Sequence, residues 1–287
     1  MTNPSDEKPG AIARNYTTFQ PSGFLSPVRS NAAGTRIELL AKDPDIDIAP
    51  DGFAVPPAEL RLYGEGPEGH FQQGLVQANM IRDILAKNQL DIAQMPRVME
   101  FGCANSRVLR HFAPEARLDG HHYFGADINA NTVLWSMTYL SPPFHFLANT
   151  TAPHLPFEDQ NLDFIYAMSI LTHIDAISFA WLYEFARVLK PGAHALVTII
   201  DHESCDVMES KMGLSNRKDL EDSDPLALFK QLENGEINML SLSPNKVGGL
   251  TFFSIPFLLD KISHLFELVD RQFGFMTSQH GLLLRRR

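Results

Sequence analysis

Two acids and a glycine stand where they could bind a nucleoside. In the stretch "RVMEFGCANSRVLRHF", a short apolar run leads to Glu100, and Gly102 follows two residues later. The next apolar run ends at Asp127. A glycine turn between a parallel strand and a helix exposes backbone N–H groups to a ligand, and an acid after the following strand can accept hydrogen bonds from ribose hydroxyls. These residues therefore predict a cofactor that contains a nucleoside.

The residues around Gly102 indicate which nucleoside is bound. A dinucleotide fingerprint reads G-x-G-x-x-G, and its second glycine lets the backbone approach a pyrophosphate. Here Ala104 occupies the second position and Arg107 the third. A carboxylate at Glu100 disfavours two phosphates but favours a ligand that carries an ammonium and a sulfonium group. The local charge predicts S-adenosylmethionine (SAM), with an NAD-dependent oxidoreductase as the alternative.

Three further residues could take a proton from an acceptor. His173 follows the fourth apolar run, and Asp201 and His202 follow the fifth. The carboxyl ends of parallel strands meet at one edge of a sheet, where ligands bind, and a neutral histidine can act as a general base near neutral pH. We expect these three as catalytic candidates, with packing as the alternative role. Cys103 and Cys205 lack zinc spacing, so no metal site is expected.

An alternation of strands and helices must position these residues. Short apolar runs separated by helical patterns are typical of parallel βαβ units that bury both faces of a sheet. The expected strands are Val98–Phe101, Tyr123–Ala126, Phe144–Leu147, Phe164–Met168 and Ala195–Ile200, with a last helix, a strand and a final strand after residue 250. The expected helices lie near 68–88, 105–113, 129–139 and 175–189.

The pattern divides the chain into three parts. Residues 1–50 are rich in Pro, Asn, Ser, Asp and Gly, so an irregular N-terminal segment is expected. Residues 51–95 are expected to form a helical lid, and 96–287 the cofactor-binding domain. Within that domain, 202–250 are polar and at best weakly helical. Because long structureless loops are rare in compact domains, this insertion is expected to be a functional cap.

Composition limits the partners of the protein. The 287 residues carry a formal net charge of -10 and are 44% hydrophobic, as expected for a globular protein with a sizeable core. An acidic chain repels nucleic-acid phosphates and anionic membrane surfaces, so neither is an expected partner. The N-terminus lacks a secretory pattern and no run is long enough to span a membrane. A cytoplasmic location is expected.

Four motifs in order resemble those of the class I SAM-dependent methyltransferases, in particular the type 11/12-like domain. "VMEFGCANSRVLR" resembles their first glycine motif and "GADINA" their second. "HLPFEDQNLDFIYAMSILTHI" and "LYEFARVLKPGAHALVTI" are similar to the segments that carry their third to fifth strands. The resemblance covers residues 97–201. It implies an α/β, Rossmann-like, seven-stranded, mostly parallel sheet with an antiparallel last strand and helices on both faces.

The resemblance also implies roles for single residues. Glu100, Gly102, Cys103 and Ala104 would surround the methionine moiety of SAM, with Cys103 acting through its backbone. Asp127 would hold the ribose, Ile128 would pack on the adenine, Asn149 would lie by the adenine edge, and Ser169 would pass near the methionine end. Structural alternatives remain: Glu100 could pair with Arg107 or Arg110, Asp127 could cap a helix near Asn129, and Asn149 could serve only in a turn.

The implied reaction is methyl transfer to an oxygen or nitrogen of a small-molecule or sugar acceptor. Ala104 and Ser106 stand where the family usually has glycine. A non-catalytic SAM-binding scaffold protein therefore stays open beside the enzyme. The sequence does not specify the acceptor or the oligomeric state.

Replacing Asp127 by alanine tests the ribose contact. Because a hydrogen bond to a charged group contributes about 1.5–3 kcal/mol, Asp127→Ala should weaken cofactor binding by that amount. Calorimetric titration with S-adenosylhomocysteine measures the change. An affinity equal to that of the unaltered protein would assign Asp127 to helix capping alone.

Overall fold

The computed structural model describes residues 46–61, 66–175, 177–212, 225–242 and 249–287. Most of the segment expected to be irregular, residues 1–45, lies outside these ranges. Residues 46–57 form a loop with a single β-bridge between Ile48 and Ala54, followed by the 3-10 helix η2 (Ala58–Leu60). Residues 46–50, the described end of the expected irregular segment, contain no helix or strand longer than this bridge.

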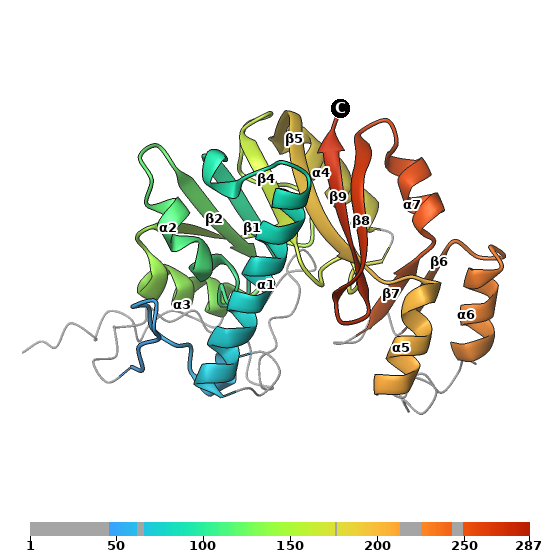
Figure 1. The fold of residues 1–287 in the computed structure, drawn as a ribbon, viewed down its shortest axis with the longest axis horizontal. Helices are drawn as coiled ribbons and strands as arrows, with labels where there is room; N and C mark the ends of the chain where they lie inside the picture. The colour runs from blue at the N-terminus through green and yellow to red at the C-terminus, as the bar shows by residue number, and fades with distance from the viewer. Residues whose placement is uncertain (1–45, 62–65, 176, 213–224, 243–248) are drawn as a thin grey trace, which may run out of the picture.

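The centre of the molecule is a seven-stranded sheet with the order β3-β2-β1-β4-β5-β9-β8 (Figure 1). The first five strands pair in parallel, and β9 is antiparallel to both of its neighbours. This topology confirms the predicted fold class. The strands are β1 (Arg97–Phe101), β2 (His122–Asp127), β3 (Phe144–Ala148), β4 (Leu162–Ala167), β5 (Leu189–Ile199), β8 (Phe266–Met276) and β9 (Gln279–Arg286).

Alternate side chains of the central strands enter two separate cores. Val98, Phe164 and Leu196 pack on one face, whereas Met99 and Ile165 pack on the other. Because successive side chains of a strand point to opposite faces, a strand buried on both sides reads as a continuous apolar run. This is why the strands could be located from the sequence.

Helices cover both faces of the sheet, as Figure 1 shows. The long helix α1 begins at Pro67, directly after its N-cap Gly66, and buries an apolar stripe that includes Ala78, Ile81 and Leu85. No described helix has the length and apolarity needed to cross a membrane. One core contains side chains of α1 (Pro67–Lys87), α2 (Ala113–Ala116) and α3 (Ala130–Leu140), and the other contains side chains of α4 (Ile177–Val188) and α7 (Ile255–Ile262).

The helix expected near 105–113 is wrong in its extent. Residues 102–108 form turns, the 3-10 helix η5 spans Leu109–Phe112, and α2 adds one short turn. Ser106 adopts a φ of +60°, which no right-handed helix contains. The glycine turn therefore extends further along the chain than its helical pattern indicates.

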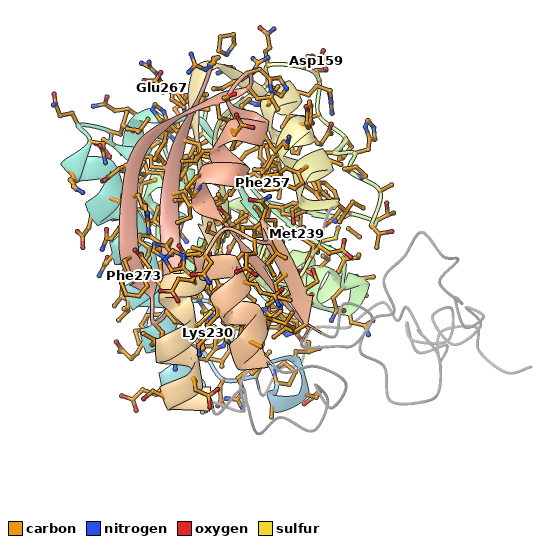
Figure 2. All side chains as sticks on the ribbon, turned by 90° about the vertical axis from the view of Figure 1, so that its right-hand side faces the viewer. Asp159, Lys230, Met239, Phe257, Glu267 and Phe273 are labelled. Carbon is orange, nitrogen blue, oxygen red and sulfur yellow. The ribbon has the colours of Figure 1, made fainter. Side chains whose placement is uncertain are left out.

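The insertion is more regular than the prediction of weak helicity. Its described residues form α5 (His202–Met212), α6 (Pro225–Glu233), β6 (Met239–Leu242) and β7 (Leu250–Phe253). These elements share a small core with Ile200. Figure 2 labels Lys230 and Met239 on this unit, to one side of β8. Backbone N–H groups of Thr251 and Phe253 donate to the carbonyls of Thr172 and Ile200, which ties the unit to the ends of β4 and β5.

Two glycines with the same backbone conformation test the steric requirement of the turn. Gly102 and Gly192 both have φ of +78°. A Cβ at Gly102 would lie 2.0 Å from Ile170 Cδ1, whereas one at Gly192 would meet nothing within 4 Å. Gly192→Ala should cost about 1–2 kcal/mol from the left-handed conformation alone. Gly102→Ala should cost about 1–3 kcal/mol more because of the contact.

The free energies of unfolding in urea measure both substitutions. Equal losses for the two variants would contradict the close approach of Ile170 to the turn.

Candidate functional site

A tight backbone path follows β1. Gly102, Ala104 and Ser106 have φ angles of +78°, +46° and +60°. The N–H groups of Gly102 and Cys103 both donate to the carbonyl of Ala126, at 2.8 and 2.9 Å. Residues other than glycine pay about 1–2 kcal/mol for such a conformation. Ala104 and Ser106 thus keep the path that glycine would take, at a cost in stability.

The Asp127 carboxylate holds this turn in place. Its Oδ2 accepts a hydrogen bond from the Ala104 N–H at 2.7 Å, and its Oδ1 accepts one from the Asn129 N–H at 2.7 Å. Asn129 is itself the N-cap of α3, since its side chain accepts from the Asn131 and Thr132 N–H groups. Burial raises the pKa of Asp127, although the hydrogen bonds from Asn129 and Ala104 oppose this. The carboxylate predicted to hold the ribose therefore also fixes the glycine turn.

Glu100 lies at the end of β1 but is only 4% exposed. Its Oε2 accepts hydrogen bonds from the Leu109 N–H at 3.0 Å and from the Tyr166 hydroxyl at 3.3 Å. Burial raises the pKa of Glu100 to about 8. The structural alternative in which Arg110 pairs with Glu100 is wrong, because Arg110 pairs with Asp51 at 2.6 Å. At neutral pH the unliganded Glu100 is therefore mostly protonated, and a cation beside it would favour its charged form.

Cys103 and Asn149 border the same turn. Cys103 is buried, and burial raises the pKa of its thiol well above the usual value. Its contribution is thus its backbone, since a buried protonated thiol is a poor nucleophile. The Asn149 N–H donates to the Asp127 carbonyl at 3.0 Å. Asn149 Oδ1 is buried without a hydrogen-bond partner in the described ranges, so it is available to accept from a ligand. Ile128 is half-buried and follows Asp127 directly.

Ser169 follows β4 with a φ of +57°. Its N–H donates to Thr198 Oγ1 at 2.7 Å. Its hydroxyl accepts from Gln279 Nε2 at 2.7 Å and lies 3.8 Å from Met276 Sδ. These contacts link the segment after β4 to the β8–β9 turn, and they restrict the rotation of the Ser169 hydroxyl group.

His173 is exposed and lies beside the insertion. Its Nδ1 is 2.8 Å from the carbonyl oxygen of Gly249. A carbonyl can only accept, so Nδ1 carries the proton and Nε2 keeps a free lone pair. The tautomer is that of a histidine that can take a proton at Nε2.

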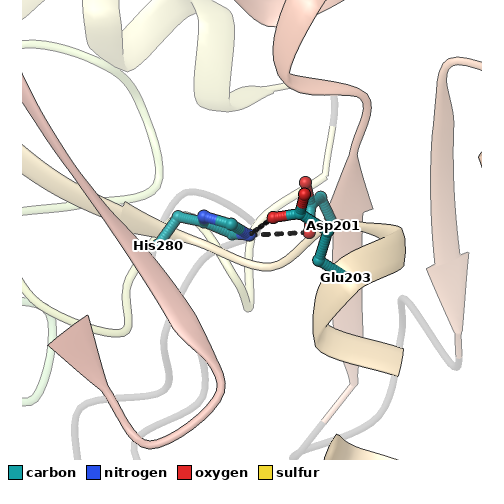
Figure 3. Close-up of side chains that lie close together, drawn as sticks. All are labelled: Asp201, Glu203 and His280. Carbon is teal, nitrogen blue, oxygen red and sulfur yellow. Dashed lines mark hydrogen bonds and ion pairs between the residues drawn. The ribbon is translucent and has the colours of Figure 1, made fainter. Parts of the chain in front are cut away.

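Asp201 is buried in a polar cluster after β5, drawn in Figure 3. His280 Nε2 lies 2.8 Å from Asp201 Oδ1 and 3.3 Å from Glu203 Oε2. Arg271 Nε donates to His280 Nδ1 at 3.1 Å, so His280 carries its proton on Nε2 and donates it to Asp201. Burial acts to raise the pKa of Asp201, but His280, His202 and Arg271 hold it below its usual value.

The Asp201, Glu203 and His280 ligand atoms lie within 4.8 Å of one another, close enough to hold a metal ion. The Arg271 guanidinium already supplies a cation there, at 2.5 Å from Glu203 Oε2 and 3.7 Å from Asp201 Oδ2. The proton on His280 Nε2 would also have to leave before a metal could bind. The cluster in its present form is an ion-pair network rather than a metal centre.

His202 is the first residue of α5, and its side chain is 41% exposed. Its Nδ1 lies 3.9 Å from Asp201 Oδ2, too far for a hydrogen bond. The structure thus brings Glu100, Gly102 and Asp127 together around one turn. His173 and the Asp201–His202 pair lie at the ends of the neighbouring strands β4 and β5.

Two residues that contact the predicted site residues Ser169 and Asp201 were not predicted from the sequence. They are Gln279 and His280. Both are the first residues of β9, which runs antiparallel to β5. The start of an antiparallel strand lies beside the carboxyl ends of the parallel strands. That rule, applied to "SQHGLLLRRR", would have placed both side chains at the functional edge.

Comparisons with known proteins agree with this geometry. Residues 99–197 match a family model described as a methyltransferase domain. The chain is similar to the PH0226 protein of Pyrococcus horikoshii OT3, with a TM-score of 0.55, 13% sequence identity and coverage of 75% of this chain and 92% of that one. It is also similar to an S-adenosylmethionine dependent methyltransferase from Mesorhizobium loti, with a TM-score of 0.51, 12% identity and coverage of 71% and 96%. These two likenesses show the fold. No curated protein matches the chain.

A pH-dependent stability follows from the buried Glu100. Its pKa is about 8 in the folded protein against 4.5 for the free side chain. Between these values the unfolded chain releases a proton that the folded chain keeps, so a rise in pH destabilises the fold. Glu100→Gln removes this effect. Its free energy of unfolding should exceed that of the unaltered protein by a margin that grows by roughly 2–4 kcal/mol from pH 5 to pH 8.

Urea unfolding at a series of pH values measures this margin, with Glu59→Gln, an exposed glutamate, as the control. Parallel pH profiles for Glu100→Gln and the unaltered protein would contradict the burial of a protonated carboxyl group.

Proposed function

We propose that the enzyme methylates an oxygen or nitrogen of an uncharged small molecule or sugar with SAM as the methyl donor, because residues 99–197 match a family model described as a methyltransferase domain. The family match decides between the two cofactors that the sequence left open, in favour of SAM over NAD. It also favours an enzyme over the non-catalytic scaffold protein.

The observation that carries the acceptor class is an open, shallow cavity of about 370 Å³ between α1 and the β8–β9 turn. Cavities for small ligands usually start at about 300 Å³. The described lining residues include no charged side chain. Amide groups suit acceptor hydroxyls, and apolar side chains suit the face of a sugar or another ring. The lining includes the polar Gln72, Gln73 and Gln77 and the apolar Val76, Met80 and Met276.

Both walls of this cavity are connected to the cofactor turns. On one side, Gln73 Oε1 accepts from Arg107 Nη1 at 3.2 Å, directly after the glycine turn. On the other side, Met276 Sδ lies 3.8 Å from Ser169 Oγ. An acceptor in the cavity would therefore lie next to the predicted methionine end of the cofactor site, as methyl transfer requires.

We assign the proton acceptor to His173. SAM, when bound, supplies a methyl group on a positively charged sulfur, which makes the transfer an in-line displacement. The acceptor oxygen or nitrogen would receive that methyl group, the sulfur would keep the electron pair of the broken bond, and the acceptor's proton would pass to His173 Nε2. The Gly249 carbonyl holds His173 in the required tautomer. Asp201 and His202 remain secondary candidates, since His280 already engages Asp201.

A panel of acceptors tests the proposed function. The protein is incubated with SAM and with neutral glycosides, neutral phenols, amines, carboxylic acids or transfer RNA, and release of S-adenosylhomocysteine is measured. Turnover with neutral hydroxyl or amine compounds is expected. Turnover confined to polyanions such as transfer RNA would overturn the acceptor class.

His173→Gln should lower turnover with the best acceptor by about 100-fold or more, the contribution typical of a general base. Its affinity for S-adenosylhomocysteine should change less than twofold, because His173 is not assigned to the cofactor. His154→Ala replaces a histidine whose side chain is 75% exposed and is the control. Equal loss of turnover and of cofactor affinity would assign His173 to packing.

A further inference from the structure

Two basic side chains, Arg61 and His70, lie close to the glycine turn. Arg61 follows η2, and the preceding carbonyl, that of Leu60, accepts from Asn105 Nδ2 at 2.7 Å. Helix α1 packs closely on the same turn. Its Gly74 is so near that an added Cβ would lie 2.0 Å from the carbonyl oxygen of Arg107. His70 precedes Gly74 by one helical turn and so projects from the same side of α1. Arg61 and His70 thus flank residues 105–107.

Polar atoms of both side chains are buried without a hydrogen-bond partner among the described residues, although the Arg61 residue as a whole is only half-buried. Arg61 Nε and Nη1 have no hydrogen-bond partner among the residues that the structure describes. His70 is 1% exposed, and neither of its ring nitrogens has a partner in those same ranges. A buried N–H group without an acceptor destabilises a fold. Two such groups side by side indicate a ligand that accepts hydrogen bonds.

The charge around His70 indicates an anionic ligand. Burial and the neighbouring Arg107, Arg110, Arg61 and His111 lower the pKa of His70 to about 3. The charge of Arg110 is offset by Asp51, which binds its guanidinium with both carboxylate oxygens at 2.6 and 2.8 Å. No carboxylate of the described residues offsets Arg61 in this way. An anion would relieve the repulsion and supply the missing acceptors.

We propose that Arg61 and His70 bind the α-carboxylate of the methyl donor. The inference rests on the proposed function, because SAM carries this carboxylate at its methionine end. Glu100 directly precedes the turn on β1, and Arg61 and His70 approach it from the end of η2 and from α1. The donor's amino-acid group thereby lies between an acidic and a basic partner.

Two ligands separate the carboxylate from the rest of the cofactor. S-adenosylhomocysteine carries the carboxylate, whereas 5′-methylthioadenosine lacks it and keeps the nucleoside and the sulfur. Calorimetry with the full chain gives the affinity of each ligand. Arg61→Gln should weaken S-adenosylhomocysteine by about 10- to 100-fold, the range for a charge-assisted hydrogen bond, and leave 5′-methylthioadenosine within about twofold. Arg61→Lys should recover part of the loss, and His70→Gln should show the same selectivity.

Arg285→Gln is the matched control, since Arg285 is half-exposed and pairs with Glu267 at 2.6 Å on the β8–β9 edge. An unchanged affinity for S-adenosylhomocysteine in Arg61→Gln would overturn the proposal. Equal weakening of both ligands would also overturn it, because it would indicate displacement of α1 rather than loss of a carboxylate contact. Failure of the unaltered protein to bind S-adenosylhomocysteine would overturn the proposed function, and this inference with it.

Discussion

The turn between β1 and η5 depends on two carboxyl groups from neighbouring strands. Glu100 accepts the N–H of Leu109 beyond the turn, and Asp127 accepts the N–H of Ala104 within it. These two bonds hold three residues at positive φ, of which only Gly102 adopts that conformation without strain. Burial raises the pKa of both acids. A cationic ligand beside these acids would favour their charged forms and lower both pKa values.

The charges around this turn suit the amino-acid group of SAM. The chain as a whole carries a net charge of -10, yet the segment above the turn gathers Arg61, Arg107 and Arg110. A zwitterionic amino-acid group matches such an arrangement, because its ammonium faces the acids and its carboxylate the basic side chains. A diphosphate would place its charge beside Glu100 instead. A sulfonium cofactor would also be compatible with a glycine-poor turn, since no backbone has to approach a pyrophosphate.

The sequence predicted the sheet well and the segments between its strands less well. Runs such as Phe164–Ala167 are apolar on both faces, and burial on both faces leaves few other structures open to them. The position of η5 could not be predicted, because left-handed φ angles at Ala104 and Ser106 follow from contacts with Asp127 and α3 rather than from local propensity. The helices of the insertion bury a small core against Ile200, but α5 carries so many polar residues that its few apolar positions give only a weak helical signal in the sequence. Arg61 and His70 escaped notice because an unpaired buried group is visible only in three dimensions.

The first residues of strand β9 contact the segments that follow β4 and β5. Its first residue, Gln279, donates to Ser169 after β4, and its second, His280, donates to Asp201 after β5. Arg271 on β8 completes the cluster through His280 and Glu203. Asp201 and His280 are buried, whereas Arg271 and Glu203 are partly exposed. Removing one member of the buried pair would leave the other without its partner, so the pair holds its two strands together. The beginning of α5, the segment after β4 and Met276 are consequently held by side chains of the same two antiparallel strands, β8 and β9.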